Sequence, residues 1–227
     1  MRVSSEFSKY AGSYGSYNVI QTKVAKKVVS HIKGEPQRIL DLGCGSGALY
    51  KELDWTPASF MGIDFAKGML ELHPKSQNIV CRFGDFNSQQ LFDELSACEF
   101  DYILSSSALQ WADDLEIVFR NLAILDKPLS LGIFTSNTFK TVNDCAGLAP
   151  MLRSVQDLLS IVEQYLNLNA EVVNFELEFE SNREIFKYIK QSGVSGSRNM
   201  LSYKETKRLI EEYPKKSLEF EVLFLYS

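Results

Sequence analysis

The stretch RILDLGCGSGALYKEL, residues 38–53, contains the feature that decides the fold. Its first five residues form a short apolar run of the kind seen in buried parallel strands. Gly43, Gly45 and Gly47 follow, and a helical pattern starts at Ala48. Glycines at such a turn let the chain bend sharply and let ligand atoms approach the backbone, which a Cβ would prevent. The stretch therefore predicts a strand, a ligand-binding loop and a helix.

Strands and helices alternate through the middle of the chain. Four more apolar runs predict buried strands, at 59–65, 78–86, 100–107 and 129–136. Four helical patterns separate the strands, at 48–53, 66–72, 89–95 and 115–125. This alternation is typical of an α/β protein whose parallel sheet carries helices on both faces.

The tail has a different period. Apolar and polar residues alternate over 172–180 and over 217–227, which indicates half-exposed antiparallel strands near a sheet edge. Two helices are expected between these strands. Ser181 and Ser202 each precede a glutamate by three residues, and this is the spacing of a capping box at a helix start.

The front of the chain carries a stripe of aromatic residues, at Phe7, Tyr10, Tyr14 and Tyr17. A helical pattern follows it. The stripe is interpreted either as packing on the domain surface or as a lid over a ligand. Gly12 and Gly15 interrupt it at a helix cost of about 1 kcal/mol each, which suits a segment that moves.

The composition of the 227 residues fits one α/β domain, and its net charge of −5 argues against nucleic-acid binding, which needs a basic surface. The four cysteines are widely spaced and follow no metal-ligand pattern: Cys44, Cys81, Cys98 and Cys145. No run resembles a signal peptide or approaches the roughly 18 apolar residues of a membrane span. We therefore expect a reduced cytoplasmic protein with no metal, membrane or nucleic-acid partner.

The glycine loop alone does not identify its ligand. Its spacing satisfies both the relaxed dinucleotide pattern G-x-G-x-x-A and the pattern G-x-G-x-G. Asp41 lies directly before the loop. A carboxylate there would face the pyrophosphate of NAD unfavourably, whereas it suits the ammonium and sulfonium groups of S-adenosylmethionine (SAM).

Two further acids lie at the ends of the next strands. Asp64 could accept hydrogen bonds from ribose hydroxyls, and Asp85 from the adenine amino group. Three acids on successive strand ends, at the crevice where open α/β sheets bind ligands, favour SAM over NAD. Taken singly, Asp41 is also interpretable as a helix cap, and Asp85, beside Gly84, as part of a turn.

The segments ILDLGCGSG, GIDFAKGML and GDF, in order between residues 38 and 136, resemble the successive motifs of class I SAM-dependent methyltransferases. The resemblance implies a Rossmann-like, mostly parallel seven-stranded sheet with the last strand antiparallel and helices on both faces. It implies one domain, 1–227, with an N-terminal lid and helix (1–34) and a SAM-binding core (35–136). Substrate-side helices, including an insertion near the C-terminus, and the terminal strands make up the rest (137–227).

The motifs also imply a set of cofactor-binding positions, namely Asp41, Gly43, Cys44, Gly45, Gly47, Asp64, Phe65, Met69, Asp85 and Phe86. Ser105 and Ser106, at the end of the fourth strand, are expected to line the methionine side of SAM. Tyr10, Tyr14 and Gln21 are expected to close over it.

A narrower resemblance concerns the segments 7–29, 105–122 and 189–196, which are similar to parts of the malonyl-acyl-carrier-protein O-methyltransferases of biotin synthesis. It implies methylation of a malonyl thioester on acyl carrier protein or coenzyme A. The segment 138–150 matches that family only loosely, and the family's Pro-Gly-Gly turn is absent from LDKPLSLG. Methylation of another small molecule or carboxylic acid therefore remains the alternative. An inactive SAM-binding protein and an NAD-dependent oxidoreductase are further rivals.

A malonyl carboxylate is already ionised at neutral pH, so no catalytic acid or base is expected. Its recognition needs a cation, for which the candidates are Arg153, Arg183 and Arg198, and Trp111 is a candidate pocket wall or core residue. The segment 183–216 contains nine Lys or Arg residues and four Glu residues. This basic region either binds an acidic carrier protein or serves as a solubilising surface.

Overall fold

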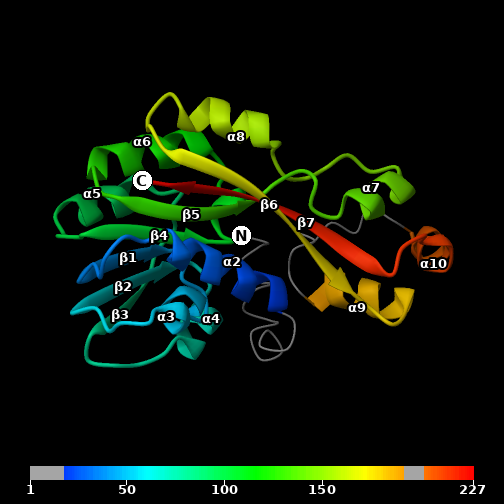
Figure 1. The fold of residues 1–227 in the computed structure, drawn as a ribbon, viewed down its shortest axis with the longest axis horizontal. Coiled ribbons are helices and arrows are strands. Elements are labelled where there is room, and N and C mark those ends of the chain that lie inside the picture. Colours follow the sequence, from blue (N-terminus) through cyan, green and yellow to red (C-terminus); the bar gives the residue numbers. More distant parts are fainter. Residues whose placement is uncertain (1–17, 192–201) are drawn as a thin grey trace.

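The computed structural model describes residues 18–191 and 202–227, which build a seven-stranded sheet in the order β3-β2-β1-β4-β5-β7-β6 (Figure 1). Its strands are β1 (Arg38–Leu42), β2 (Ser59–Asp64), β3 (Ile79–Phe83), β4 (Tyr102–Ser106), β5 (Leu129–Phe134), β6 (Asn169–Glu178) and β7 (Ser217–Tyr226). The first five strands are parallel, and β7 is antiparallel to both its neighbours, β5 and β6. The predicted fold class is confirmed.

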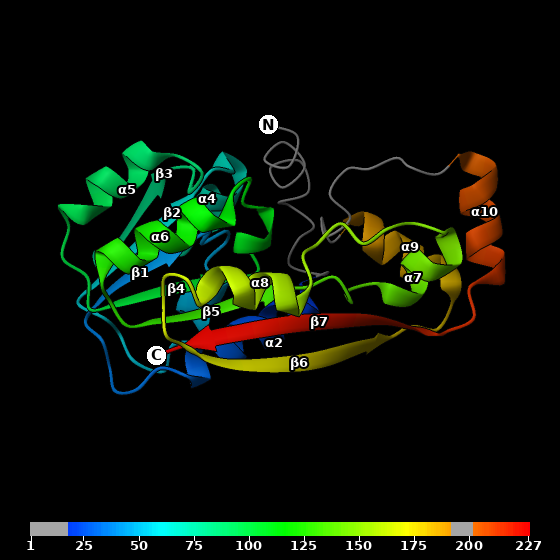
Figure 2. The same ribbon diagram turned by 90° about the horizontal axis from the view of Figure 1, so that it is seen from above.

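The helices include the four predicted between the parallel strands and several others. They are α2 (Val19–Ser30), α3 (Ala48–Glu52), α4 (Lys67–Leu72), α5 (Gln89–Ser96), the 3-10 turn η2 (Leu109–Trp111), α6 (Leu115–Leu125), α7 (Lys140–Ala146), α8 (Val155–Val162), α9 (Asn182–Gln191) and α10 (Tyr203–Glu212). Helices α5, α6 and α8 cover one face of the sheet, and α2 and α3 cover the other (Figure 2).

Helix α2 is held against β4 and β5 at a place where the sheet has no side chain. A Cβ added to Gly132 would lie 2.8 Å from Val24 and 3.0 Å from Val28, so glycine permits the close approach of the helix. The hydroxyl of Ser130 donates to the carbonyl of Val28 at 2.9 Å. The N-terminal end of α2 is thereby fixed near the carboxyl ends of the parallel strands.

The two terminal strands continue beyond the rest of the sheet. Phe134, the last residue of β5, pairs with Val222, and β6 and β7 remain paired from there to Glu178 and Ser217. This extension points past the carboxyl ends of the parallel strands. Helices α7, α9 and α10 pack around it, and we call these three helices with the extension the distal module (Figures 1 and 2). Its centre is Phe220.

Several local expectations need correction. The alternating pattern predicts the half-exposed edge strand β6 correctly, but it is wrong for β7, which is buried between β5 and β6 because its last residues are continuously apolar. Helices α7 and α8 were not expected. Helix α8 begins with a complete capping box between Ser154 and Asp157.

The two predicted capping boxes differ in outcome. At α10 the box is complete, because Ser202 and Glu205 exchange both hydrogen bonds. At α9 the amide of Glu184 donates to Ser181 at 3.4 Å, but the Glu184 carboxylate accepts from the amide of Glu180 instead. Both helices nevertheless start where the sequence predicts.

Candidate functional site

An open cleft lies at the carboxyl ends of β1, β2 and β4. Its empty volume is about 630 Å³, open solvent included. The order of the parallel strands reverses between β1 and β4, and ligands of open α/β sheets bind at such a point. The described residues that line the cleft are Asn18, Gln21, Gly43, Cys44, Gly45, Ser46, Ala48, Asp64, Phe65, Met69, Ser106, Ser107, Ala108 and Trp111.

The glycine loop forms one wall of the cleft and has no freedom to accept a side chain at its first glycine. Gly43 has a φ of +78°, and a Cβ added there would lie 2.2 Å from the Cβ of Ala108. The amides of Gly43 and Cys44 both donate to the carbonyl of Ile63, at 2.8 and 3.0 Å. The loop is therefore held between the end of β2 and the residues before η2.

Asp64 ties the end of β2 to the same loop. Its carboxylate accepts from the amide of Gly45 at 2.8 Å and from the amide of Ala66 at 2.7 Å. Burial raises the pKa of Asp64, and these backbone donors partly offset that rise. Each oxygen accepts one of these two hydrogen bonds and retains further acceptor capacity.

Asp41 is placed differently from the expectation. It is 0% exposed and lies outside the lining of the cleft, and neither carboxylate oxygen has a hydrogen-bond partner in residues 18–191 and 202–227. Burial raises the pKa of Asp41 well above its ordinary value, and the nearby Asp64 raises it further. The reason is its register: Asp41 pairs with Gly62 and Leu104, both inside their strands, so it lies beneath the loop.

Gln21, which the sequence analysis expects to close over the cofactor, lines the cleft from α2. The side chain is 6% exposed, and its Oε1 atom is buried without a hydrogen-bond partner within the described part of the chain. A buried acceptor without a donor is costly in a folded protein, and Gln21 is one of the residues that line the cleft. The position therefore suits a ligand that donates hydrogen bonds.

The two predicted serines differ in their position relative to the cleft. Ser106 lines the cleft, whereas Ser105 is buried and its hydroxyl donates to the carbonyl of Leu42 at 2.6 Å. Ser107, which was not predicted, also lines the cleft and has a φ of +58°. Of the other predicted positions, Cys44, Phe65, Met69 and Trp111 lie in the lining.

Three further predicted cofactor positions, besides Asp41 and Ser105, lie outside the lining. Asp85 accepts from the backbone amide and the side chain of Asn87, at 2.9 and 2.8 Å, which is the turn interpretation. Phe86 is buried in the core. Gly47 has a φ of +80° and lies against Pro74. Tyr10, Tyr14 and Arg198 are outside the described residues.

The lining given by the described residues contains no lysine, arginine or histidine. Arg153 lies just before α8, where its carbonyl accepts from the amide of Ser136 beyond the end of β5. Arg183 is exposed in the first turn of α9. The structure therefore does not bring either arginine into the cleft. The sequence analysis missed five lining residues, although all of them lie in segments that it examined: Asn18, Ser46, Ala48, Ser107 and Ala108.

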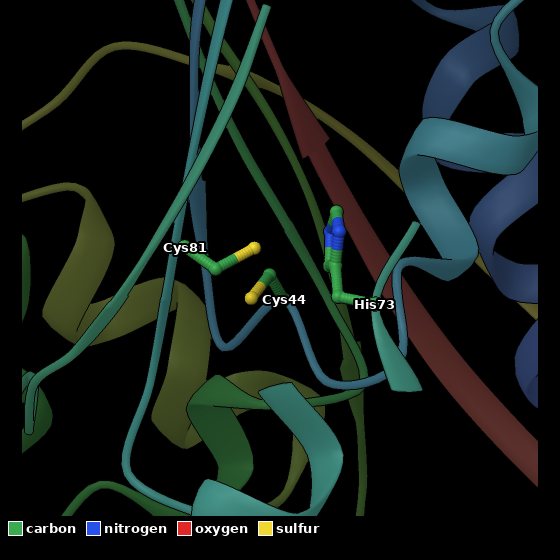
Figure 3. A group of neighbouring side chains, drawn as sticks. All are labelled: Cys44, His73 and Cys81. Carbon is green, nitrogen blue, oxygen red and sulfur yellow. The ribbon is translucent and has the colours of Figure 1, made fainter. Parts of the chain in front are cut away.

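A second cluster was missed entirely. Cys44, His73 and Cys81 converge from three separate segments, and their possible ligand atoms all lie within 4.8 Å of one another (Figure 3). The residues are far apart in the sequence and follow no recognisable ligand spacing, so only the fold brings them together. Burial lowers the pKa of His73, which favours the neutral imidazole.

Among the described residues, no helix combines the length and apolar character that crossing a membrane requires.

Comparison with known proteins defines the class first. The sequence family described as a methyltransferase domain matches residues 40–128. The crystal structure of YcgJ from Bacillus subtilis has the same fold, with a TM-score of 0.61 at 13% identity over 92% of this chain and 98% of that chain. Phosphoethanolamine N-methyltransferase 2 of Haemonchus contortus, solved with S-adenosyl-L-methionine, gives a TM-score of 0.53 at 14% identity, covering 92% of this chain and 52% of that chain. Residues 40–128 thus match a methyltransferase domain, and the chain has the fold of the class I methyltransferases.

The curated relatives are more particular. The chain is 28% identical to a malonyl-[acyl-carrier protein] O-methyltransferase of Brevibacillus brevis, over 85% of this chain and 69% of the relative. It is 24% identical to the protein of the same name from Legionella pneumophila, over 85% of this chain and 73% of the relative. The resemblance predicted from the sequence is thus confirmed.

Proposed function

We propose that this methyltransferase transfers the methyl group of SAM to the free carboxylate of a malonyl thioester on acyl carrier protein, an early step of biotin synthesis. One observation carries the choice of acceptor chemistry. The described lining of the cleft holds no histidine, lysine or arginine, and its one carboxylate, Asp64, is already bound by two backbone amides. Such a site positions reactants without supplying a general base, which suits an acceptor that is already ionised.

The residues present fit SAM. The unpartnered Oε1 of Gln21 is an acceptor for the ammonium group, and Asp64 has remaining acceptor capacity for ribose hydroxyls. Phe65 and Met69 offer apolar surface for the adenine ring. SAM, when bound, supplies an electrophilic methyl group on a sulfonium. The glycine loop, Gln21 and Asp64 would hold and orient it.

The reaction needs positioning more than proton transfer. A carboxyl group with an ordinary pKa near 4 is ionised at neutral pH, so its oxygen attacks directly. One O–C bond forms as the C–S bond breaks, and the products are a methyl ester and S-adenosylhomocysteine, with no proton moved. Holding the two reactants in line contributes about 7–11 kcal/mol in well-oriented systems. Trp111 and Ala108 line the cleft in which the two reactants would be held, and they help to exclude water.

The names of the curated relatives support the carrier protein as partner. The charges of the distal module refine where an acidic carrier docks. On α10, Lys207 pairs with Glu211 and Arg208 with Glu212, and this helix has as many acidic as basic residues. Helix α9 carries three basic residues against one acid, and it lies nearer the parallel strands than α10 in both views (Figures 1 and 2). We assign the carrier contact to α9.

The decisive experiment incubates the purified protein with methyl-labelled SAM and malonyl-acyl carrier protein, and identifies the product by mass spectrometry. Acetyl- and succinyl-carrier protein and malonyl-coenzyme A serve as matched acceptors. We expect a methyl ester on the malonyl carrier and none on the acetyl carrier, which lacks a free carboxylate.

The outcomes separate cofactor from acceptor. Binding of SAM by calorimetry without an ester on any acceptor would refute the malonyl assignment and favour another small molecule or an inactive SAM-binding protein. Failure to bind SAM would refute the cofactor as well.

A further inference from the structure

Three side chains converge behind the glycine loop from segments that the fold alone brings together. Cys44 belongs to the loop, His73 follows α4, and Cys81 lies in β3 (Figure 3). Cys44 is 4% exposed and His73 is 3% exposed. Cys81 is partly exposed and Cys44 also lines the cleft, but no step of the proposed methyl transfer needs a thiol or an imidazole.

Gly62, in β2, makes room for both sulfur atoms. A Cβ added to this glycine would lie 2.7 Å from the Sγ of Cys44 and 3.5 Å from the Sγ of Cys81. Cys81 is the register partner of Gly62 in the neighbouring strand. The two thiols thus meet over a position where β2 has no side chain.

His73 is arranged as a metal-ligating histidine usually is. Its Nδ1 atom is 3.0 Å from the carbonyl of Pro74, which can only accept, so Nδ1 carries the proton and donates. The other nitrogen, Nε2, then has a free lone pair, and it is buried without a hydrogen-bond partner among the residues that the structure describes. Metal-bound histidines commonly donate the second ring nitrogen to a backbone carbonyl, which fixes the tautomer and the ring orientation.

We propose that Cys44, His73 and Cys81 form a binding site for a thiophilic d10 cation of the Zn²⁺ class. The ligands would be two thiolates and the Nε2 atom of His73, the donor types that zinc prefers, with a fourth position left open. Binding releases the two thiol protons, so the ion and its three ligands are neutral together.

The geometry requires only a small adjustment. Zinc bonds of about 2.3 Å to sulfur and 2.0–2.1 Å to nitrogen place tetrahedral ligand atoms about 3.6–3.8 Å apart. The three atoms lie within 4.8 Å of one another, so they need to approach by roughly 1 Å.

The test is a titration of the full chain with Cd²⁺ under a non-thiol reductant, followed by the ultraviolet thiolate-to-metal charge-transfer band. We expect one equivalent to bind through two thiolates. Cys44→Ser and Cys81→Ser should each weaken binding at least about tenfold and reduce the band, and His73→Asn should weaken binding by a similar factor. The double variant Cys98→Ser/Cys145→Ser, which removes the two other cysteines, is the matched control and should bind as the parent does.

Circular dichroism establishes that each variant is folded before it is titrated. Absence of the band in the folded parent, or its persistence in Cys44→Ser/Cys81→Ser, would overturn the proposal. A Cys44–Cys81 disulfide formed in air, found together with no metal binding under reductant, would also overturn it. Zinc competition against the bound Cd²⁺ then reports the affinity without any measurement of methyl transfer.

Discussion

The glycine-loop region and the distal module are held together by different means. Around the loop, buried groups fix the backbone: Asp64 binds the amide of Gly45, and Ser105 binds the carbonyl of Leu42. On the outer helix of the distal module, exposed side chains pair with one another, as Arg208 does with Glu212. A site built from backbone should respond to substitution abruptly. A surface built from exposed charges should respond gradually and in a salt-dependent way.

The largest effect is expected at the loop, for Gly43→Ala. Its added Cβ would lie 2.2 Å from that of Ala108, and the residue would keep a φ of +78°. The loop must therefore move, and SAM affinity measured by calorimetry should fall at least about 100-fold, because about 3 kcal/mol or more is required to accommodate such a clash.

Gly34→Ala separates backbone strain from the clash. Gly34 has nearly the same φ, +77°, but a Cβ there would meet nothing within 4 Å. This variant should lose about 1–2 kcal/mol of stability and keep its SAM affinity. Equal SAM affinities in the two alanine variants would show that the loop is less constrained than its contacts indicate.

A smaller effect is expected for Gln21→Ala. If the buried Oε1 receives a hydrogen bond from the ammonium of SAM, its removal should weaken SAM binding by about 10- to 100-fold, the range for bonds to charged groups. The ligand-free protein should not lose stability through a lost hydrogen bond, because Oε1 has none in the structure. Thr22→Ala, exposed on the same helix, is the control and should leave binding unchanged. A Gln21→Ala protein that binds SAM like the parent would remove this residue from the site.

The loop region was also the more predictable one. Apolar runs and glycines identify β1 and the turn after it, because both depend on local backbone preferences. The same pattern could not distinguish Asp64, which lines the cleft, from Asp41, which lies beneath it. Whether an acid at the end of a strand lines the cleft depends on whether it is the last strand residue that the neighbouring residues bury. A shift of one residue along the strand decides this. The cluster of Cys44, His73 and Cys81 was unpredictable for a related reason, since only the packing of three segments creates it.

The distal module was predictable in its capped helices and not in its connections. Ser202 identifies the start of α10 because a capping box is a local interaction. Helix α7 instead begins after Phe139, a bulky residue with a φ of +59°, which is held there by packing on Phe220. The net charge of the segment 183–216 was misleading because it ignores how charged side chains pair in the fold. A count along the sequence includes Lys207 and Arg208, whose charges the structure pairs with glutamates one turn away.

Charge reversal tests the gradual response expected of the module. Changing Arg183, Lys187 and Lys190 on α9 to Glu should raise the KM for malonyl-acyl carrier protein by about 5- to 10-fold at low salt, with the increase shrinking at high salt. These three residues form no ion pair within the described part of the chain. The same change at Lys204, Lys207 and Arg208 on α10 is the matched control, and it should alter KM less than about twofold. A larger effect on α10 than on α9 would move the docking surface to the outer helix. A malonyl thioester lacking the carrier protein should be insensitive to both changes.

The smallest effect concerns Asp41 and has a definite sign. Burial raises the pKa of Asp41 in the folded protein. The contribution of Asp41 to folding stability is therefore most favourable below the ordinary carboxyl pKa, and it is lost as pH rises through the raised value. The variant Asp41→Asn has no such group, so its melting temperature should exceed that of the parent by a margin that grows from pH 4 upward.

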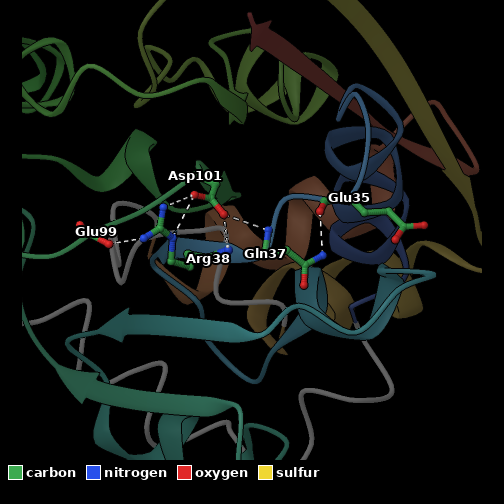
Figure 4. Close-up of polar contacts among 5 residues, drawn as sticks. All are labelled: Glu35, Gln37, Arg38, Glu99 and Asp101. Atoms are coloured by element: carbon green, nitrogen blue, oxygen red, sulfur yellow. Dashed lines mark hydrogen bonds and ion pairs between the residues drawn. The ribbon is translucent and has the colours of Figure 1, made fainter.

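Asp101 provides the opposite case. Arg38 lowers its pKa through the contacts drawn in Figure 4, so stability from this pair is present above the ordinary carboxyl pKa and is lost as pH falls. Asp101→Asn should therefore melt below the parent at neutral pH and approach it in acid. Saturating SAM should narrow the margin at Asp41 and not the one at Asp101, because a cation bound above the loop favours the ionised form of Asp41 alone. Parallel melting curves for Asp41→Asn and the parent at every pH would show that the buried carboxylate does not titrate with folding.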